Sequence, residues 1–358
     1  MLHVITGLTY GGAEDQLVHM AAHTRHQMEV VGLDQFSQAG ETLAREGIRV
    51  FNVRTPGRYD FRVIVRLARL MRHRDYDVVH VHLLRAGLHG RVAARLARVP
   101  VVVYTEHSIG RDAIEELPGS APMRWLYRAT ARLADVTIAV SPWVEELIRE
   151  WGVRGRTMVL ENGVDLDRLR FDDSTRATAR AELGIPRDAT VIGTVGRMVE
   201  PKRPAVLLRA AAPLVREGAW LVLVGDGALR LALEAEAAEL GIRSRTLFTG
   251  ARIDVPAMLC AMDVFASLTT AEAYGLAPLE ALACGLPVLV THAPAVEEWG
   301  PPRVRWVDAE PDDVERELRR ALDDRPGRME ILDQLGRYSV QRTVERLDDL
   351  YDELMASR

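Results

Sequence analysis

The sequence has almost no lysine and little cysteine. Of its 46 basic residues only Lys202 is a lysine, and the other 45 are arginines. Cys260 and Cys284 are the 2 cysteines, and both stand in apolar stretches without a C-x-x-C spacing. This usage predicts reduced core residues of a cytoplasmic protein and argues against a disulfide framework or a cysteine metal site.

Long hydrophobic runs are also missing. No stretch of about 18 uninterrupted apolar residues occurs, so the sequence predicts no membrane-spanning helix. The opening "MLHVITGL" has no basic region before its apolar run, which argues against a secretory signal. The net charge is −5, and the basic residues are not interleaved with aromatics. Both features argue against nucleic-acid binding.

The length and the distribution of charge indicate two domains. A chain of 358 residues with 48% hydrophobic and 27% charged residues is typical of a globular protein with more than one core. Residues 1–160 carry 21 basic and 17 acidic residues, whereas residues 161–358 carry 25 basic and 34 acidic ones. Two halves with net charges of +4 and −9 are what two domains with different ligands would show.

Short β-branched runs alternate with amphipathic stretches in both halves. This alternation predicts an α/β fold with two doubly wound, Rossmann-like parallel sheets. We expect an N-terminal domain over 1–161, a linker over 162–186, a second domain over 187–337 and a C-terminal helix over 338–358 that packs towards the first domain. Ligands of open parallel sheets bind at the carboxyl ends of the strands, so the expected active site is a cleft between two facing sheets.

Two glutamates mark one strand end of the second half. Glu280 is the single charge in the run "LAPLEALAC", which predicts a buried helix in which a carboxylate needs a partner. Glu272 lies in the loop before that helix, and Gly275 permits close approach of a ligand to the backbone. Free N–H groups around Tyr274 to Leu276 favour an anion. Two carboxylates around an anion site suit a nucleotide sugar, which has hydroxyl groups at both ends and phosphate between them.

The single lysine follows another strand of the second half. "VIGTVGRMVEPKRP" runs from a strand through Arg197 to Lys202, and a helix is expected to begin near Pro204. Arginine offers a planar fork and lysine a compact charge, so this pair suits a diphosphate leaving group. A sequence that uses arginine elsewhere predicts a specific need for lysine here, although a chance surface lysine is the alternative.

Strand ends in the first half carry glycines and a histidine. Gly11 and Gly12 precede a helix and would let the backbone approach a phosphate, although a Gly-Gly pair is often a simple turn. Glu106 and His107 follow the apolar run "VVVYT". His107 is expected to face the ligand cleft.

Taken together, these segments resemble the GT-B fold retaining glycosyltransferases of family four. The resemblance covers essentially the whole chain, through "GGAE", "TEHS", "ENGVD", "GRMVEPKRP", "LVGDGALR" and "EAYGLAPLEALACGLPV". The resemblance implies that Glu280 binds the ribose hydroxyls. Glu272 and the backbone of Tyr274, Gly275 and Leu276 would then hold the donor sugar.

The resemblance also implies roles for the remaining site residues. Arg197 and Lys202 would bind the diphosphate, His107 would lie near the donor sugar, and the backbone at Gly12 would approach the phosphate. Such enzymes usually need no metal and no cofactor besides the nucleotide sugar, because these cations take the place of a metal ion. The one Asp-x-Asp sequence, Asp165 to Asp167, falls in the expected linker.

The implied reaction is a metal-independent transfer of a hexose to an acceptor hydroxyl with retention, by front-face attack. The sequence departs from the family pattern at "HAPAVEE", where many relatives have Gly-Gly, and at Ala273 and Tyr274. The donor base, the sugar and the acceptor are therefore open. Two alternatives also remain: a nucleotide-sugar epimerase of the same fold, and an inactive nucleotide-sugar-binding subunit of a partner transferase.

The expected acceptor is a carbohydrate, a lipid-linked sugar or a small molecule. A basic helix predicted in the first half favours one of these classes. Arg62, Arg66, Arg69 and His73 share one face of the pattern "RVIVRLARLMRHR". Such a face can lie against anionic lipid at the inner membrane surface, which would suit a lipid-linked acceptor. An ordinary solvated outer face is the competing interpretation.

Overall fold

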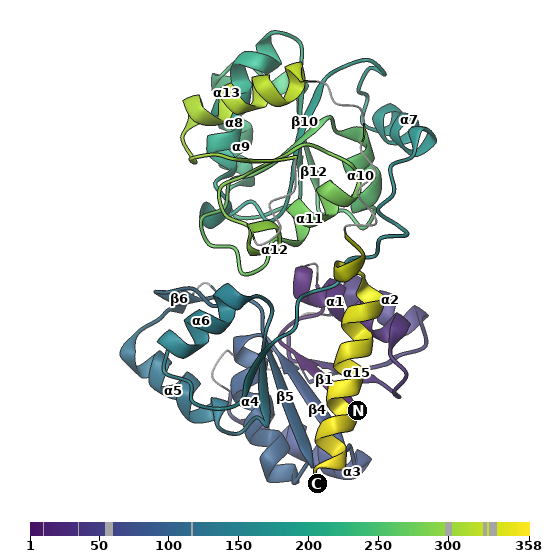
Figure 1. The fold of residues 1–358 in the computed structure, drawn as a ribbon, viewed down its shortest axis with the longest axis vertical. Helices are drawn as coiled ribbons and strands as arrows, with labels where there is room; N and C mark the ends of the chain where they lie inside the picture. The colour runs from purple at the N-terminus through teal and green to yellow at the C-terminus, as the bar shows by residue number, and fades with distance from the viewer. Residues whose placement is uncertain are drawn as a thin grey trace. The chain divides into compact units, whose positions relative to one another are not determined.

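The computed structural model describes residues 1–9, 11–34, 36–53, 60–115, 117–297, 303–324, 328 and 335–358. The chain divides into two compact units, which we call unit 1, Met1–Gly163 with Tyr338–Arg358, and unit 2, Val164–Arg337. Both are built from alternating strands and helices (Figure 1). No helix in the described ranges is long and apolar enough to cross a lipid bilayer.

Unit 1 contains a parallel sheet of seven strands in the order β3-β2-β1-β4-β5-β8-β9, within the residues that the structure describes. The strands are β1 (Leu2–Ile5), β2 (Glu29–Gly32), β3 (Arg49–Asn52), β4 (Val78–His82), β5 (Val101–Glu106), β8 (Val136–Ala139) and β9 (Thr157–Val159). A short antiparallel pair, β6 (Ala113–Ile114) and β7 (Leu117–Pro118), lies apart from this sheet. The sequence alone did not indicate β6, β7 or β9.

Helices connect and cover the strands of unit 1. They are α1 (Gly12–His23), α2 (Gln38–Arg45), α3 (Arg62–Arg74), α4 (Leu84–Ala97), α5 (Ala121–Ala131), α6 (Pro142–Glu150) and the C-terminal α15 (Val340–Ala356). The yellow helix α15 packs beside α1 (Figure 1). Val344, Leu347 and Tyr351 of α15 join the same core as Ile5, Val103 and other strand residues. The chain's last helix therefore completes the core of its first domain.

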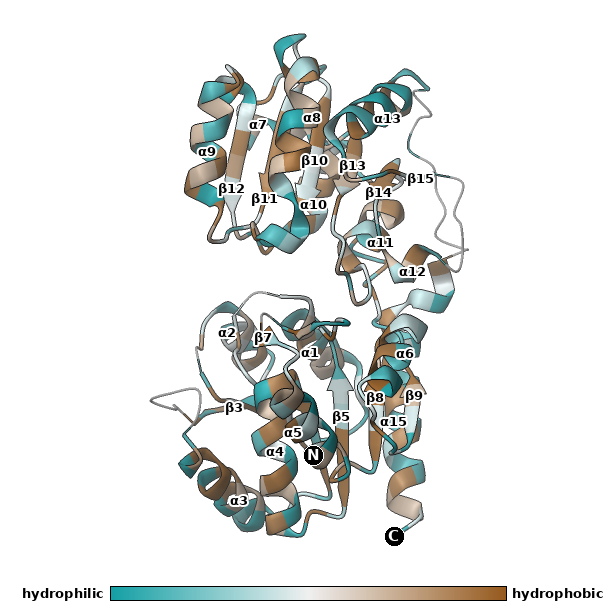
Figure 2. Cartoon of the chain, turned by 90° about the vertical axis from the view of Figure 1, so that its left-hand side faces the viewer, coloured by the Kyte–Doolittle hydropathy of each residue, from teal (hydrophilic) through white to brown (hydrophobic). Residues whose placement is uncertain are grey.

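Unit 2 contains a parallel sheet in the order β12-β11-β10-β13-β14-β15, again among the described residues. Its strands are β10 (Val191–Val195), β11 (Trp220–Val224), β12 (Thr246–Gly250), β13 (Val264–Ser267), β14 (Val288–Val290) and β15 (Val304–Trp306). Its helices are α7 (Asp173–Glu182), α8 (Pro204–Arg216), α9 (Arg230–Glu239), α10 (Val255–Ala261), α11 (Leu276–Ala283), α12 (Pro294–Glu297) and α13 (Pro311–Asp323). The strands are predominantly hydrophobic, and the helices carry hydrophilic residues on their outer sides (Figure 2).

The predicted α/β class with two parallel sheets is confirmed. In both sheets the strand order reverses beside the first strand, between β1 and β4 and between β10 and β13. Loops leave in opposite directions at such a point, which opens a crevice at the carboxyl ends of the two strands. These two places are where ligand sites are expected.

The segment 162–186, which the sequence presents as a linker, includes a helix bound to unit 2. Arg176 and Arg180 of α7 donate hydrogen bonds to the carboxylate of Asp263, at 2.6 and 2.8 Å. Arg180 is almost fully buried and also donates to the carbonyl of Ala261. The attachment uses arginines rather than an apolar stripe, so the hydrophobic pattern of the sequence did not reveal it.

Candidate active site

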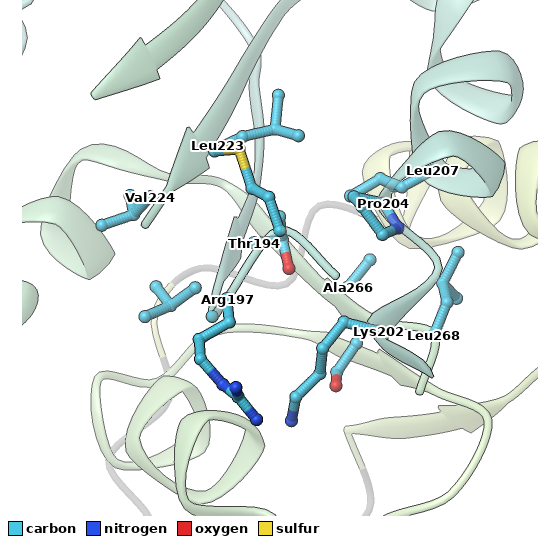
Figure 3. A pocket seen from close by; sticks show the side chains of 13 residues that line it. Thr194, Arg197, Lys202, Pro204, Leu207, Leu223, Val224, Ala266 and Leu268 are labelled. Atoms are coloured by element: carbon cyan, nitrogen blue, oxygen red, sulfur yellow. The ribbon is translucent and has the colours of Figure 1, made fainter. Parts of the chain in front are cut away.

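A pocket lies in unit 2 at the reversal of strand order between β10 and β13. Its lining includes Thr194, Gly196, Arg197, Lys202, Pro204 and Ser267 (Figure 3). The pocket holds about 400 Å³ of empty space, part of it open to solvent. Polar groups and two cations therefore gather where an open parallel sheet is expected to bind its ligand.

The floor of this pocket is fixed by two glycine loops in close contact. The backbone N–H of Gly196 donates to Val224, and that of Met198 donates to Asp226. A Cβ added at Gly225 would lie 2.0 Å from the carbonyl oxygen of Gly196, and Gly225 has a φ of +131°. Only glycine fits there without moving the backbone. The motif "GDG" after β11 thus holds the loop that carries Arg197.

Lys202 and Glu272 form an ion pair beside the pocket. A 3₁₀ turn over Glu200–Lys202 and the start of α8 at Pro204 hold the lysine, and the backbone of Thr270 donates to Pro201 at 3.3 Å. The two side chains are 31% and 17% exposed. A diphosphate could therefore still reach the ammonium, and the carboxylate keeps a free face for hydroxyl donors.

Arg197 extends from the end of β10 and is exposed. In Figure 3 its guanidinium and the ammonium of Lys202 point the same way from the pocket lining. The helix after Lys202 begins with Pro204, which offers no N–H group. The two side-chain cations are therefore the charged groups that this end of the pocket offers to an anion.

The start of α11 brings the remaining predicted residues of unit 2 together. Gly275 has a φ of +100°, and a Cβ there would lie 3.1 Å from that of Ala293. Tyr274 is buried, and its carbonyl accepts a hydrogen bond of 2.7 Å from Ala295. Leu276 begins the helix, and Glu280 is partly exposed one turn later.

The described part of the departure "HAPAVEE", residues 292–297, contains α12, which contacts α11; Glu298 lies outside the described residues. His292 Nδ1 lies 2.7 Å from Glu297 Oε1, and the same oxygen accepts a 3.1 Å hydrogen bond from the backbone of Ala293. The sequence marks this segment as a departure from the family pattern, but the pairing of His292 with Glu297 emerges only in the structure. The only sequence signal for this pair was that a histidine and a glutamate stand five residues apart across a short segment.

In unit 1, Gly11 and Gly12 lie after β1 at the start of α1. Gly12 is the first residue of the helix, and both glycines are exposed. Glu14 and Asp15 occupy the first helical turn. These carboxylates stabilise the helix end but also repel an anion that approaches it. Tyr10, which directly precedes Gly11, lies outside the described residues.

Glu106 is fully buried at the end of β5, next to His107. One of its carboxylate oxygens accepts 2.8 Å hydrogen bonds from the hydroxyls of Tyr104 and Tyr127, and the other accepts from the backbone of Ser108. Burial raises the pKa of Glu106, and these donors oppose the rise. The carboxylate is occupied on both oxygens, so it holds the loop of His107 in place and is not available as a nucleophile.

His107 itself contacts a histidine cluster that the sequence analysis missed. His3, His80 and His82 are buried within unit 1, and each has one nitrogen atom within 4.8 Å of the others. Burial lowers the pKa of His107 to about 4 and that of His3 to about 3. The signal was present as "HVH", which places two histidines on the same face of the strand β4.

The structure therefore assembles two separate groups. Arg197, Lys202, Glu272 and the start of α11 with Glu280 belong to unit 2, whereas Gly11, Gly12 and His107 belong to unit 1. Among the described residues, the group with metal-binding potential is the buried histidine cluster. In the pocket of unit 2, the positive charge comes from the side chains of Arg197 and Lys202.

Two family models match the chain. Residues 10–168 match the model described as Glycosyltransferase Family 4, and residues 175–341 match the model described as Glycosyl transferases group 1. The chain is 31% identical over 313 residues to a D-inositol 3-phosphate glycosyltransferase from Saccharomonospora viridis. That alignment covers 79% of this chain and 71% of the relative.

A second relative is the Escherichia coli UDP-Gal:alpha-D-GlcNAc-diphosphoundecaprenol alpha-1,3-galactosyltransferase, 31% identical over 240 residues. This match spans 65% of the chain and 62% of the length of the relative. Among solved structures, Anabaena Alr3699/HepE in complex with UDP and glucose superposes with a TM-score of 0.86 at 22% identity. That superposition covers 98% of this chain and 99% of HepE and shows a shared fold.

Proposed function

The chain belongs to glycosyltransferase family 4, and from this membership we propose that it transfers a hexose from a nucleotide-diphosphate sugar to an acceptor hydroxyl. The observation that carries the proposal is the pairing of Lys202 with Glu272 beside Arg197, at the strand-order reversal of unit 2. This group offers two cations for a diphosphate and a carboxylate for sugar hydroxyls. UDP-sugars are the first donors to test, because two of the similar proteins are named with UDP or UDP-Gal.

We propose further that the reaction retains the anomeric configuration. The bond between the anomeric carbon and the diphosphate breaks while the acceptor oxygen bonds to the same face of that carbon. The acceptor proton passes to the leaving phosphate oxygen. Arg197 and Lys202 stabilise the charge that develops on the diphosphate, so this step needs no metal ion.

The roles of the other residues follow the same proposal. Glu280 binds the ribose hydroxyls, and Glu272 with the backbone at Tyr274, Gly275 and Leu276 holds the sugar. The partial exposure of Glu272 and Glu280 supports these roles. In unit 1, His107 contacts the donor sugar and the backbone of Gly12 approaches the phosphate.

A lipid-linked acceptor is supported by the surface of α3. Arg62, Arg66, Arg69 and His73 are exposed, while Val63, Leu67 and Met71 are buried against unit 1. Phe61, at the start of this helix, is 70% exposed. Exposed arginines beside an exposed aromatic ring suit peripheral contact with anionic lipid.

A donor screen tests the proposal directly. Purified protein is heated with UDP-, GDP-, ADP- and dTDP-sugars in the presence of a metal chelator. A ligand at 100 times its Kd stabilises the folded state by about 2.7 kcal/mol, so the donor should raise the Tm. The stabilising donor is then incubated with candidate acceptors, and the anomeric configuration of the product is read by NMR.

The outcomes separate the proposal from its alternatives. Product with the donor's anomeric configuration supports a retaining transferase. Conversion of the donor to its epimer without any acceptor would instead identify an epimerase. A Tm shift with no turnover on any acceptor would favour a nucleotide-sugar-binding subunit, and no shift at all would contradict the donor site.

A further inference from the structure

Three histidines of unit 1 form a continuous hydrogen-bonded chain. Nδ1 of His3, on β1, lies 3.0 Å from Nε2 of His82, on β4. Nδ1 of His82 lies 3.2 Å from Nε2 of His107, which follows β5. His3 and His82 are fully buried, and His107 is partly exposed. This histidine chain, His3–His82–His107, thus runs from the interior of the sheet to a strand end.

The rings of the histidine chain are neutral at neutral pH. Burial lowers the pKa of His3 to about 3 and that of His107 to about 4, and it holds the pKa of His82 well below its usual range. A neutral imidazole carries one N–H, so one nitrogen donates and the other accepts. Each link in the histidine chain needs one donor and one acceptor. Only two arrangements satisfy both links: every proton on Nδ1, or every proton on Nε2.

The buried end of the histidine chain, at His3, distinguishes these two arrangements of protons. Nε2 of His3 is buried and has no hydrogen-bond partner among the residues that the structure describes. If every ring carried its proton on Nε2, Nε2 of His3 would be a buried N–H without an acceptor. If every ring carried its proton on Nδ1, Nε2 of His3 would have only an unused lone pair. Buried N–H groups without partners are the rarer case. The penalty for one is large enough to bias the two populations by about tenfold.

We propose that His3 and His82 are positioning residues that hold His107 in its Nδ1–H tautomer. His3 donates to His82, and His82 donates to Nε2 of His107, which leaves Nδ1–H of the partly exposed His107 as its remaining donor. The inference rests on the proposed function only for the identity of the acceptor of that N–H, which is an oxygen of the donor sugar. The tautomer itself follows from the hydrogen bonds of unit 1.

His80 lies outside the histidine chain although its ring centroid is only 4.1 Å from that of His82. Its two nitrogens contact the hydroxyls of Tyr351, at 2.5 Å, and Thr105, at 2.7 Å. A hydroxyl can donate or accept, so these contacts do not select a tautomer. A metal ion bound by His3, His80 and His82 would have to replace hydrogen bonds that already satisfy both nitrogens of His80 and of His82. The contacts therefore favour the hydrogen-bonded chain over a metal site.

The test is a long-range ¹H–¹⁵N NMR spectrum of the full-length protein labelled in its histidine rings, without nucleotide. Protonated and bare imidazole nitrogens have well-separated shifts, so the spectrum reports each tautomer directly. We expect Nδ1 protonated and Nε2 bare in His3, His82 and His107. Protonation of His107 on Nε2 in the unaltered protein would overturn the proposal, as would stoichiometric bound zinc. This measurement does not depend on donor binding, so it can fail separately from the proposed function.

Two variants of His82 provide a matched pair. The amide nitrogen of asparagine lies near the position of Nδ1, so His82→Asn can still donate to His107. The amide of glutamine extends to the position of Nε2, so His82→Gln retains the contact to His3 and loses the one to His107. We expect His82→Asn to keep the His107 tautomer, and His82→Gln to yield a mixture and a kcat lower by about tenfold. Equal His107 tautomers and equal kcat in both variants would overturn the proposal.

Discussion

The ammonium of Lys202 lies against the carboxylate of Glu272, a residue 70 positions later in the chain. The contact joins the loop after β10 to the loop after β13, on the two sides of the strand-order reversal in unit 2. An ion pair this accessible contributes little to stability, on the order of 0–1 kcal/mol. Its place beside the pocket of unit 2 therefore suits a role in ligand binding better than a role in folding.

Replacing Lys202 should impair catalysis more than folding. Lys202→Ala removes a cation from the developing diphosphate charge, so kcat should fall by about 100-fold with the Tm nearly unchanged. Lys202→Arg should recover only part of the rate, because a planar fork cannot reproduce a compact charge beside Glu272. Steady-state kinetics with the identified donor measures both.

The control for Lys202 is Arg209→Ala in α8. Arg209 is half exposed and forms a 2.5 Å ion pair with Glu236. This change removes a cation of the same unit away from the pocket, so kcat should stay the same. Equal rates for Lys202→Ala and Arg209→Ala would contradict a diphosphate role for the lysine.

Substitution of Gly275 should affect both stability and donor binding. Gly275→Ala places a Cβ at a φ of +100° and 3.1 Å from the Cβ of Ala293. We expect a loss of about 1–3 kcal/mol in the free energy of unfolding and a higher KM for the donor. Gly241→Ala is the matched control, since Gly241 has a φ of +72° with nothing within 4 Å of an added Cβ. Equal effects on KM would show that the start of α11 is not part of the donor site.

Acid should destabilise the protein through its buried histidines. The pKa of His3 is about 3 in the folded state and that of an unfolded histidine is about 6.5. A lowered folded-state pKa contributes stability that is complete above pH 6.5 and is lost as the pH falls. The free energy of unfolding should therefore decrease by about 1.4 kcal/mol per pH unit for each such ring below this pH. Urea unfolding at a series of pH values measures the slope.

Glu106 changes the free energy of unfolding with pH in the direction opposite to that of the buried histidines. Burial raises its folded-state pKa, so its contribution to stability is complete below the unfolded pKa of 4.5 and is lost as the pH rises through the folded value. Glu106→Gln removes this compensation and should steepen the loss of stability in acid. A stability that stays constant from neutral pH to pH 4.5 in the unaltered protein would contradict a neutral, buried histidine cluster.

The basic face of α3 should bind anionic vesicles. Changing Arg62, Arg66 and Arg69 to glutamate should weaken sedimentation with vesicles that contain phosphatidylserine, since each basic residue contributes about 1 kcal/mol near such a surface. The matched control is the same change at three exposed arginines of unit 2, Arg187, Arg216 and Arg245. Equal binding by both triple variants would assign any attraction to net charge alone.

Much of the fold could be read from local patterns. Apart from β9, the strands of both sheets follow the periodicity of apolar residues, and so do the helices α3, α8 and α15 with the positions of proline; these signals act within a few residues of the chain. Arg197, Lys202, Glu272 and Glu280 stand out as polar residues placed just after apolar strands or in a helix, whereas the sugar and ribose roles of the two glutamates came from the resemblance to family four. Such positions are fixed by the sequence itself, because parallel strands share one carboxyl edge.

Contacts between distant segments were decided only by the tertiary structure. β1 pairs with β4 in a register that sets His3 beside His80, and this register also allows His3 to reach His82, 79 residues away. The attachment of α7 through Arg176 and Arg180 depends likewise on a carboxylate supplied by Asp263. Local propensity determines which segments become strands and helices. Strand order and packing determine which polar groups meet, because hydrogen bonds between distant segments carry no periodic signal in the sequence.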